Sequence, residues 1–372
     1  MRTALLLLLA ASAAAGQRIG IDTHLDVAQR VLVEGVDLSQ RLKDGQVDIP
    51  RLHEGGMNAP FFALWVPTFY GGSEAVRRTL DLRDAMQGLF DKHPELIELA
   101  VTAADIERVT KAGKIAAVLS LEGGHQIADD LAVLRMYQRM GIRAMTLTHF
   151  RNNNWADSST DKPAHNGLTE FGKSVVREMN RIGMIVDISH VSDKTFYDVL
   201  AVSTKPVIAT HSSCRAINDV PRNMNDDMLK ALARNGGVVS INFFPSFVSA
   251  KDAAAGKKTI SRANAMQPNL TGAALDEFAR KNHFEEFKMH PALATIDDVV
   301  AHIDHAVKVA GIDHVGIGSD FDGIDSVPKG LEDISKMPAL AVALKKKGYS
   351  DSDIQKIWGS NVLRVFREVV GK

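Results

Sequence analysis

The sequence predicts an α/β protein of the (β/α)8 TIM-like barrel class, with a helical insertion after the seventh strand and further helices at the C-terminus. Two observations support this prediction: eight short apolar segments recur along the 372 residues, and helix-like segments separate them. Continuously apolar strands are typical of parallel sheets that are buried on both faces. Eight strands alternating with helices favour a closed barrel over an open sheet.

The strands and the clearest helices can be placed by residue range. The predicted strands cover residues 18–26, 59–67, 115–124, 143–150, 183–191, 206–213, 236–244 and 314–323. Helices are predicted at 131–141, 168–183 and 225–237, where apolar residues recur at helical spacing and glycine follows. Residues 247–295 are polar, charged and Ala-rich, and they break this rhythm. We interpret them as the helical insertion, a solvated excursion from the barrel, with a lid over the site as the alternative.

Composition is that of an ordinary globular protein with one large core. Hydrophobic residues make up 45% of the chain, charged residues 24%, and the net charge is −1. Without a basic surplus there is no support for a nucleic-acid-binding surface. We therefore expect residues 17–372 to form a single (β/α)8 domain and to bind no nucleic acid.

The N-terminal residues 1–16 are predicted to be a signal peptide. One arginine precedes an apolar run from Ala4 to Ala10, and small residues follow up to Ala15. The run is too short for a membrane span; a frayed N-terminal helix is the alternative interpretation. The C-terminus lacks the hydrophobic tail that precedes a lipid anchor. We expect an exported protein, periplasmic or extracellular, without a membrane anchor.

Polar side chains are predicted at the C-terminal ends of six of the eight strands. Because these ends meet at one rim of a barrel, where active sites are built, the residues should share a pocket. Each alone could be a buried polar residue with its hydrogen bonds satisfied, but seven at the same end predict a site. They are His24 and Asp26, Glu122, His149, His190, His211 and Asp320.

Imidazole and carboxylate groups without a thiolate suit Zn²⁺ or another borderline divalent ion. His24 and Asp26 point to the same side of an extended strand, so both can reach one metal. His190 and His211 end adjacent strands and could hold a second ion, with Glu122 bridging the pair. Two such ions would lower the pKa of a shared water and polarise a carbonyl group.

The remaining histidines and the cysteine are expected to have structural roles. His125 follows two glycines beyond the third strand, and we leave it outside the metal ligands. The single cysteine, Cys214, excludes an intrachain disulfide and is expected to be a small buried hydrophobic residue. Structural or surface positions are expected for His53, His93, His165, His283, His290, His302 and His305, and His314 should lie at the opposite end of the barrel.

An ordered set of motifs resembles the membrane (renal) dipeptidase family, zinc peptidases of the amidohydrolase superfamily. The motifs are THLD, SLEGG, MTLTHF with NNNWADSS, DISHVSD, THSS followed by PRN, GSDFDG, and GLEDISKMPAL with NVLRVF, and they run from His24 to about Phe366. The resemblance implies two Zn²⁺ ions per chain. It also implies hydrolysis of free dipeptides, including those with a C-terminal D-residue, by a metal-bridging hydroxide. It places His24, Asp26 and Glu122 on one zinc, with Glu122 bridging to a second zinc on His190 and His211.

The same resemblance implies roles for the other site residues. His149 would contact the substrate carbonyl and stabilise the tetrahedral intermediate. Arg222 and Asn223 would receive the terminal carboxylate, which a planar guanidinium can hold through two parallel hydrogen bonds. Asp320 would lie beside the hydroxide, either passing a proton to the leaving amine or orienting the free ammonium group.

Some features depart from the mammalian members of that family. The first motif is His-Leu-Asp rather than His-Asn-Asp, and Val27, Ala28 and Gln29 replace the aromatic lining that follows it, so the side-chain preference stays open. The missing disulfides and anchor fit a bacterial periplasmic or secreted enzyme. Family members are often dimeric, so a homodimer is a further expectation.

Two other functions compete with the dipeptidase. One is a barrel metallohydrolase acting on another small amide or ester, such as a lactone, phosphoester or N-acyl amino acid. Those relatives usually carry His-x-His on the first strand and often a bridging lysine, whereas this chain has His24-x-Asp26 and Glu122. The other is a non-catalytic exported barrel protein, which predicts damaged ligand positions.

Overall fold

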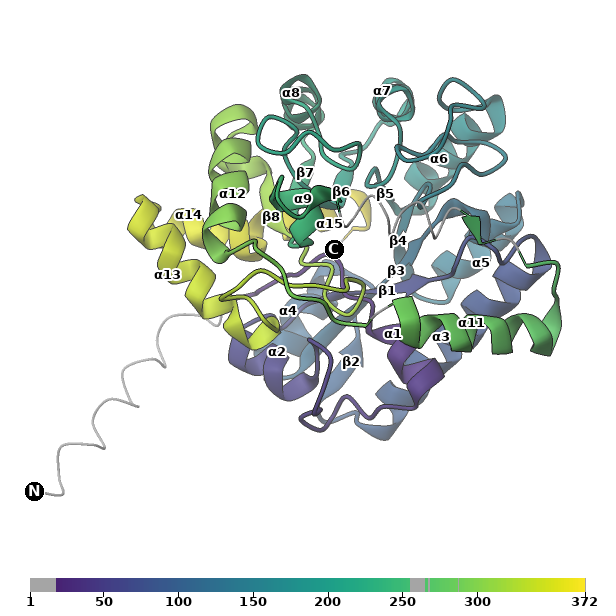
Figure 1. The fold of residues 1–372 in the computed structure, drawn as a ribbon, viewed down its shortest axis with the longest axis horizontal. Helices are drawn as coiled ribbons and strands as arrows, with labels where there is room; N and C mark the ends of the chain where they lie inside the picture. Colours follow the sequence, from purple (N-terminus) through teal and green to yellow (C-terminus); the bar gives the residue numbers. More distant parts are fainter. Residues whose placement is uncertain (1–17, 255–264, 267, 287, 372) are drawn as a thin grey trace, which may run out of the picture.

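The computed structural model describes residues 18–371 except 255–264, 267 and 287 (Figure 1). The predicted signal peptide, residues 1–16, lies outside the described residues. The described chain forms an eight-stranded parallel sheet curled into a barrel and surrounded by helices, which confirms the predicted fold class. The strands are β1 (Phe61–Trp65), β2 (Ile97–Leu99), β3 (Ile115–Glu122), β4 (Ile142–Thr146), β5 (Ile185–Asp187), β6 (Ile208–Ser212), β7 (Val238–Ile241) and β8 (Val315–Ile317).

Strand order follows the chain from β1 through β3 to β8, and β2 pairs with the start of β3. The prediction of a regular first strand at 18–26 was wrong. This segment makes isolated bridges, Asp22 to Ile317 on one side and Leu25 to Phe62 on the other. Helix α1 begins at Val27 and β8 has only three residues, so no continuous ladder can form. The bridges nevertheless place the segment between β8 and β1, where it closes the barrel.

The strand register brings side chains from successive strands to one level. Trp65 pairs with Glu122, Glu122 with Thr146, and Thr146 with Asp187. All four residues end their strands. The loops that follow therefore begin together at one rim, which is where a barrel builds its site.

The helices pack around the barrel. Predicted helices at 131–141, 168–183 and 225–237 are confirmed as α5, α6 and α8. Polar side chains of Asp130, Thr169 and Asn225 accept the first free N–H groups of these helices. The α-helices are α1 (Val27–Gln29), α2 (Ile49–Gly55), α3 (Ser73–Lys92), α4 (Ala103–Lys111), α5 (Leu131–Arg139), α6 (Glu170–Ile182), α7 (Asp193–Val202), α8 (Asp226–Arg234), α9 (Pro245–Val248), α11 (Gly272–Glu286), α12 (Ile296–Ala310), α13 (Met337–Lys347), α14 (Asp351–Gln355) and α15 (Asn361–Val369).

Several short helical turns complete the fold. They are the π-helical turns Arg30–Glu34 and Lys356–Ser360, and the 3-10 turns Gly124–Ile127, Ile312–His314 and Ile334–Lys336. No helix among the described residues combines the length and the apolar character that a membrane span requires.

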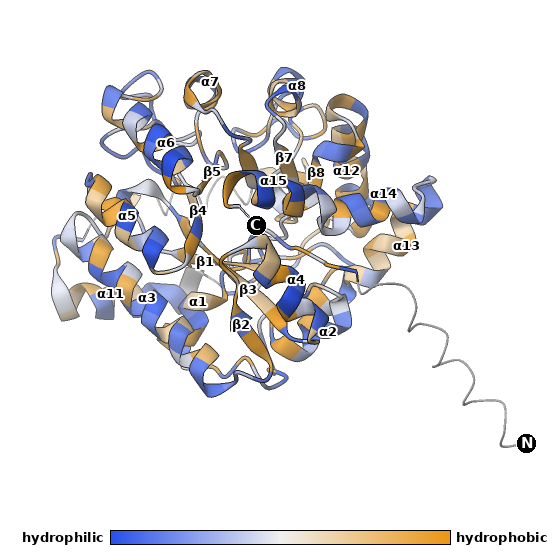
Figure 2. Cartoon of the chain, turned by 180° about the vertical axis from the view of Figure 1, so that it is seen from behind, coloured by the Kyte–Doolittle hydropathy of each residue, from blue (hydrophilic) through white to orange (hydrophobic). Residues whose placement is uncertain are grey.

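Helix α15 lies across the barrel at the end opposite the polar rim. Figure 2 shows it in the middle of the surrounding helices when the molecule is viewed from behind. Its Phe366 contacts Phe61 edge to face, with 6.1 Å between ring centroids. Both belong to a buried apolar cluster that also includes Ile21, Ile185 and Val238. Apolar side chains thus fill this end, and polar residues gather at the other.

The predicted insertion at 247–295 falls partly outside the described residues. Its described part carries α11, which lies beside α3 (Figure 1). The carboxylate of Asp276 on α11 accepts from Tyr70 Oη at 2.9 Å and from Arg77 Nη2 at 2.7 Å. Phe278 packs on Phe69 with 5.3 Å between ring centroids. These contacts anchor α11 to the start of α3 and to the residues just before it.

Candidate metal centre

The five predicted metal ligands converge at the barrel rim, and all are buried. Glu122 lies at their centre, and its two carboxylate oxygens face different partners. Oε1 lies 3.0 Å from His190 Nε2 and 3.2 Å from His211 Nε2. Oε2 lies 3.4 Å from His24 Nε2, which is itself 3.4 Å from Asp26 Oδ2. This is the arrangement that a carboxylate bridging two cations requires.

The unpaired atoms of the cluster show that a cation fits there. His24 Nε2 and Asp26 Oδ1 are buried and have no hydrogen-bond partner among the described residues. Buried polar atoms without partners are costly, and a cation between these atoms would satisfy them. Among the described residues, every group of side chains that could hold a metal ion belongs to this site. The nitrogen and oxygen donor set suits a borderline divalent metal.

A hydrogen-bonded chain behind His211 sets the tautomer of its ring. Thr210 Oγ1 donates to Asp187 Oδ2 at 2.6 Å, so the same hydroxyl must accept from His211 Nδ1 at 2.8 Å. His211 Nε2 therefore carries the lone pair that a metal ligand needs. Burial also lowers the pKa of His211 and that of His190 well below the usual value, so both rings are neutral.

Asp187 is a hydrogen-bonding hub that the sequence reasoning missed. Besides Thr210, its carboxylate accepts from Thr146 Oγ1 at 2.5 Å and from the Ser189 N–H at 2.9 Å. It thereby ties the ends of β4, β5 and β6 together beneath the ligands. The signal that could have revealed it was an acidic residue in the middle of a predicted buried strand, 183–191.

His190 and Asp320 share an unusual backbone conformation. Each lies three residues beyond its strand, and each has a φ of 67°, in the left-handed region that non-glycine residues rarely adopt. Such conformations persist only where the surroundings impose them, often at functional sites. Here they occur at two positions where the chain turns over the rim.

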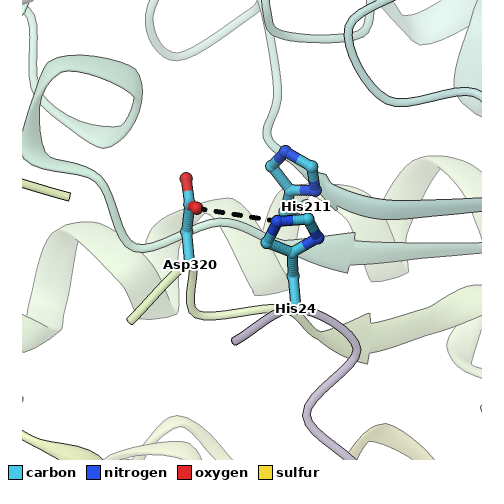
Figure 3. Close-up of side chains that lie close together, drawn as sticks. All are labelled: His24, His211 and Asp320. Atoms are coloured by element: carbon cyan, nitrogen blue, oxygen red, sulfur yellow. Dashed lines mark ion pairs between the residues drawn. The ribbon is translucent and has the colours of Figure 1, made fainter. Parts of the chain in front are cut away.

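Asp320 faces His24 across the cluster (Figure 3). Its Oδ1 lies 4.0 Å from His24 Nε2, and its Oδ2 accepts from Asn242 Nδ2 at 2.8 Å. Burial raises the pKa of Asp320 to about 6. The last residue of GSDFDG must be glycine, because a Cβ at Gly323 would lie 2.1 Å from Asp26 Oδ2 and 2.8 Å from Asp320 Oδ1.

Arg222 lies beneath the cavity wall with one donor unused. Its guanidinium stacks over Phe247 at 5.2 Å, and Nη2 donates to the His211 carbonyl at 3.0 Å. Its Nε is buried without a partner. Burial lowers the pKa of Arg222 to about 10, so it remains a cation at neutral pH. A carboxylate at this place would satisfy both the charge and the free donor.

Asn223 is placed differently from the expectation. Both N–H groups of its amide are used, donating to the carbonyls of Asn218 and Phe247 at 2.8 Å each. The side chain therefore holds two loops together and offers no donor to a substrate carboxylate. Adjacent residues of an irregular loop point in different directions, which a sequence motif does not reveal.

A cavity with about 590 Å³ of empty space opens above the cluster. His149 lines it, with Nε2 3.8 Å from Glu122 Oε1. His125 lies outside the ligand set and lines a neighbouring polar cavity. Apolar wall residues that sequence reasoning did not single out complete the lining: Trp65, Phe150, Phe244, Phe247 and Ile324.

A parallel barrel whose rim gathers buried imidazoles and carboxylates defines a metal-dependent hydrolase. The model of the membrane dipeptidase family, Peptidase family M19, matches residues 10–371. The chain belongs to this family and is a metallodipeptidase, which hydrolyses a peptide bond. The family that the motifs resemble is thus confirmed. The comparisons support the dipeptidase function over the two competing functions, a barrel hydrolase of another substrate and a non-catalytic barrel protein.

Similar proteins include two fungal dipeptidases. Dipeptidase tcpJ of Claviceps purpurea is 37% identical over 90% of this chain and 72% of its own length. Dipeptidase verJ of Clonostachys rogersoniana is 35% identical over 89% and 77%.

Solved structures with the same fold include two bacterial proteins. The probable dipeptidase PvdM from Pseudomonas aeruginosa has a TM-score of 0.81 and 29% identity, covering 95% of this chain and 96% of that one. A metallopeptidase from Rhodobacter sphaeroides, liganded with a phosphinate mimic of L-Ala-D-Ala, has a TM-score of 0.77 and 25% identity, covering 95% and 99%.

Proposed function

We propose that this enzyme is a binuclear zinc dipeptidase that cleaves free dipeptides. His24, Asp26 and Glu122 would hold one ion, and Glu122, His190 and His211 the other. The observation that carries this proposal is the position of Glu122, whose two oxygens face two separate ligand groups. When bound, two such ions would supply an activated water and polarise the scissile carbonyl.

Arg222 would limit the substrate to dipeptides by binding the terminal carboxylate. Its buried cation and unpartnered Nε lie next to the ligand His211, whose carbonyl it also contacts. A terminal carboxylate bound there must belong to the residue directly after the scissile bond. Longer peptides would place an uncharged amide against the buried guanidinium and leave its charge unpaired.

His149 and Asp320 would act on the reacting groups. A proton on His149 Nε2 could be donated to the oxygen of the developing tetrahedral intermediate, a contribution of about 3 kcal/mol in comparable sites. Asp320, whose Oδ1 lies 4.0 Å from His24 Nε2, would accept a proton from the attacking water and pass it to the leaving amine. The hydrogen bond from Asn242 holds one carboxylate oxygen of Asp320, and the other oxygen faces His24.

Substrate stereochemistry and cellular location are further parts of the proposal. Acceptance of a C-terminal D-residue is supported by the related Rhodobacter metallopeptidase, which binds a mimic of L-Ala-D-Ala. Export to the periplasm or the extracellular space is supported by the order of charged, apolar and small residues in 1–16. A homodimer remains a suggestion from the family.

The test is a panel of L,L- and L,D-dipeptides, together with C-terminally amidated dipeptides and tripeptides. Released amino acids are quantified for the purified enzyme with and without a chelator. We expect chelator-sensitive cleavage of the free dipeptides alone. Equal cleavage of amidated dipeptides would contradict the carboxylate clamp. An absence of cleavage by enzyme carrying its full metal complement would contradict the proposed substrate class.

A further inference from the structure

Trp65, the last residue of β1, lies against His149 in the wall of the active-site cavity. Its indole Nε1 lies 3.4 Å from His149 Nδ1, and the ring centroids are 5.7 Å apart. Both residues are buried, with 8% and 7% of their surface exposed. Because an indole N–H can only donate, His149 Nδ1 must be the acceptor of this hydrogen bond.

We propose that Trp65 is a positioning residue that holds His149 in the tautomer with its proton on Nε2. A neutral imidazole has one N–H and one lone pair. The other tautomer would set the Nδ1 proton against the indole proton and lose this hydrogen bond, which is costly in a buried site. With Trp65 in place, the Nε2–H points towards the reaction centre, where Nε2 lies 3.8 Å from Glu122 Oε1.

The main chain of Trp65 is fixed by its surroundings. The carbonyl of Trp65 accepts from Gln29 Nε2 at 2.7 Å, and Gln29 Oε1 accepts from Arg78 at 3.0 Å. The strand register pairs Trp65 with Glu122. The donor that sets the tautomer is therefore tied to the same level of the barrel as the central carboxylate of the metal centre.

This inference rests on the proposed role of His149 as a donor to the developing oxyanion. Trp65→Phe removes the N–H and keeps an aromatic ring, so both tautomers of His149 become accessible. Loss of one neutral hydrogen bond corresponds to a decrease in kcat of about 3- to 10-fold. KM should change less, because the charge on the substrate oxygen develops only in the transition state.

Two measurements on the zinc-loaded enzyme test the inference. NMR of protein with ¹⁵N-labelled histidine rings reports which nitrogen of each imidazole carries the proton, and His149→Ala assigns the His149 signals. We expect the proton on Nε2 in the unsubstituted enzyme, and a partial transfer to Nδ1 in Trp65→Phe. A proton on Nδ1 of the unsubstituted enzyme would overturn the inference without recourse to any variant.

Steady-state kinetics of Trp65→Phe is compared with that of Trp358→Phe. Trp358 is similarly buried, at 7% exposure, and does not line the cavity, so this variant should keep its kcat. Equal kcat values for the two variants would overturn the positioning role of Trp65. The His149→Ala variant separates this from a failure of the proposed function: an undiminished kcat there would contradict the role of His149 itself.

Discussion

Arg222 is the residue whose chemistry most narrowly restricts the substrate. It is a buried cation with no carboxylate partner among the described residues, stacked on Phe247 and hydrogen bonded to the main chain of the proposed ligand His211. A buried charge that lacks a counter-ion is unfavourable unless a ligand supplies one. The terminal carboxylate of a dipeptide would be that counter-ion.

Substitution of Arg222 by methionine should remove the distinction between free and amidated dipeptides. We expect kcat/KM for a free dipeptide to fall by about 100-fold, because the charge-assisted hydrogen bond to the terminal carboxylate is lost, while the low rate on the amide changes little. Arg181→Met is the control, since Arg181 is exposed and pairs with Glu178 on α6. An unchanged ratio of the two rates in Arg222→Met would contradict the clamp.

The convergence of the candidate ligands could be predicted from the sequence because their chemistry and their strand-end positions coincide. His24, Glu122 and His211 each follow an apolar run, and the barrel brings such positions together. The orientation of a side chain beyond a strand could not be predicted. Asn223 faces away from the cavity, and Trp65 belongs to an apolar run in which nothing distinguishes its indole N–H from core packing.

Helix α12 is joined to the loop after β6 and to α9 through one buried histidine. His302 Nδ1 accepts from the Cys214 N–H at 3.0 Å, and Nε2 contacts the Val248 carbonyl at 3.2 Å. Cys214 is buried as expected, and its thiol also contacts the His302 carbonyl. The ring is therefore neutral, with each nitrogen committed to a different element.

His302 should make the stability of the protein depend on pH. Burial lowers the pKa of His302 to about 4, below its usual value of 6.5. The unfolded chain then binds a proton between pH 6.5 and 4 that the folded chain does not, so stability decreases as the pH falls through this window. The difference amounts to roughly 3 kcal/mol.

The check is urea unfolding of the metal-free protein at pH 7 and near pH 4.5, compared with His302→Gln. We expect the variant to be less stable at pH 7, yet to lose less stability on acidification than the unsubstituted protein. Metal is removed from both proteins, so that loss of bound metal at acid pH does not contribute to the difference in stability. Parallel losses in the two proteins would show that His302 does not carry this pH dependence.

At the level of elements, the sequence predicted the helices well and the first strand poorly. Helices α5, α6 and α8 each have a polar cap and a periodic apolar face, which are local signals. The segment 18–26 carries the same apolar pattern as a strand. Its pairing depends on the short β8 and on the turn into α1, neither of which is a local property of the segment.

The barrel as a whole brings residues next to its first and last strands to a single centre. His24 precedes β1 and Asp320 follows β8, yet they face each other across the cluster, as Figure 3 shows. The opposite end is filled by α15 and its apolar partners. The fold thus separates an apolar base from a polar rim that carries the unpaired ligand atoms.

The most direct test of the two-metal centre is a zinc titration of the metal-free enzyme, with bound metal and kcat measured at each step. Because Glu122 presents one oxygen to each ligand group, we predict that activity on a free dipeptide reaches its plateau at two zinc ions per chain. We also predict that the melting temperature rises as the sites fill. Full activity with a single bound zinc ion, and no further change when more is added, would contradict the binuclear centre.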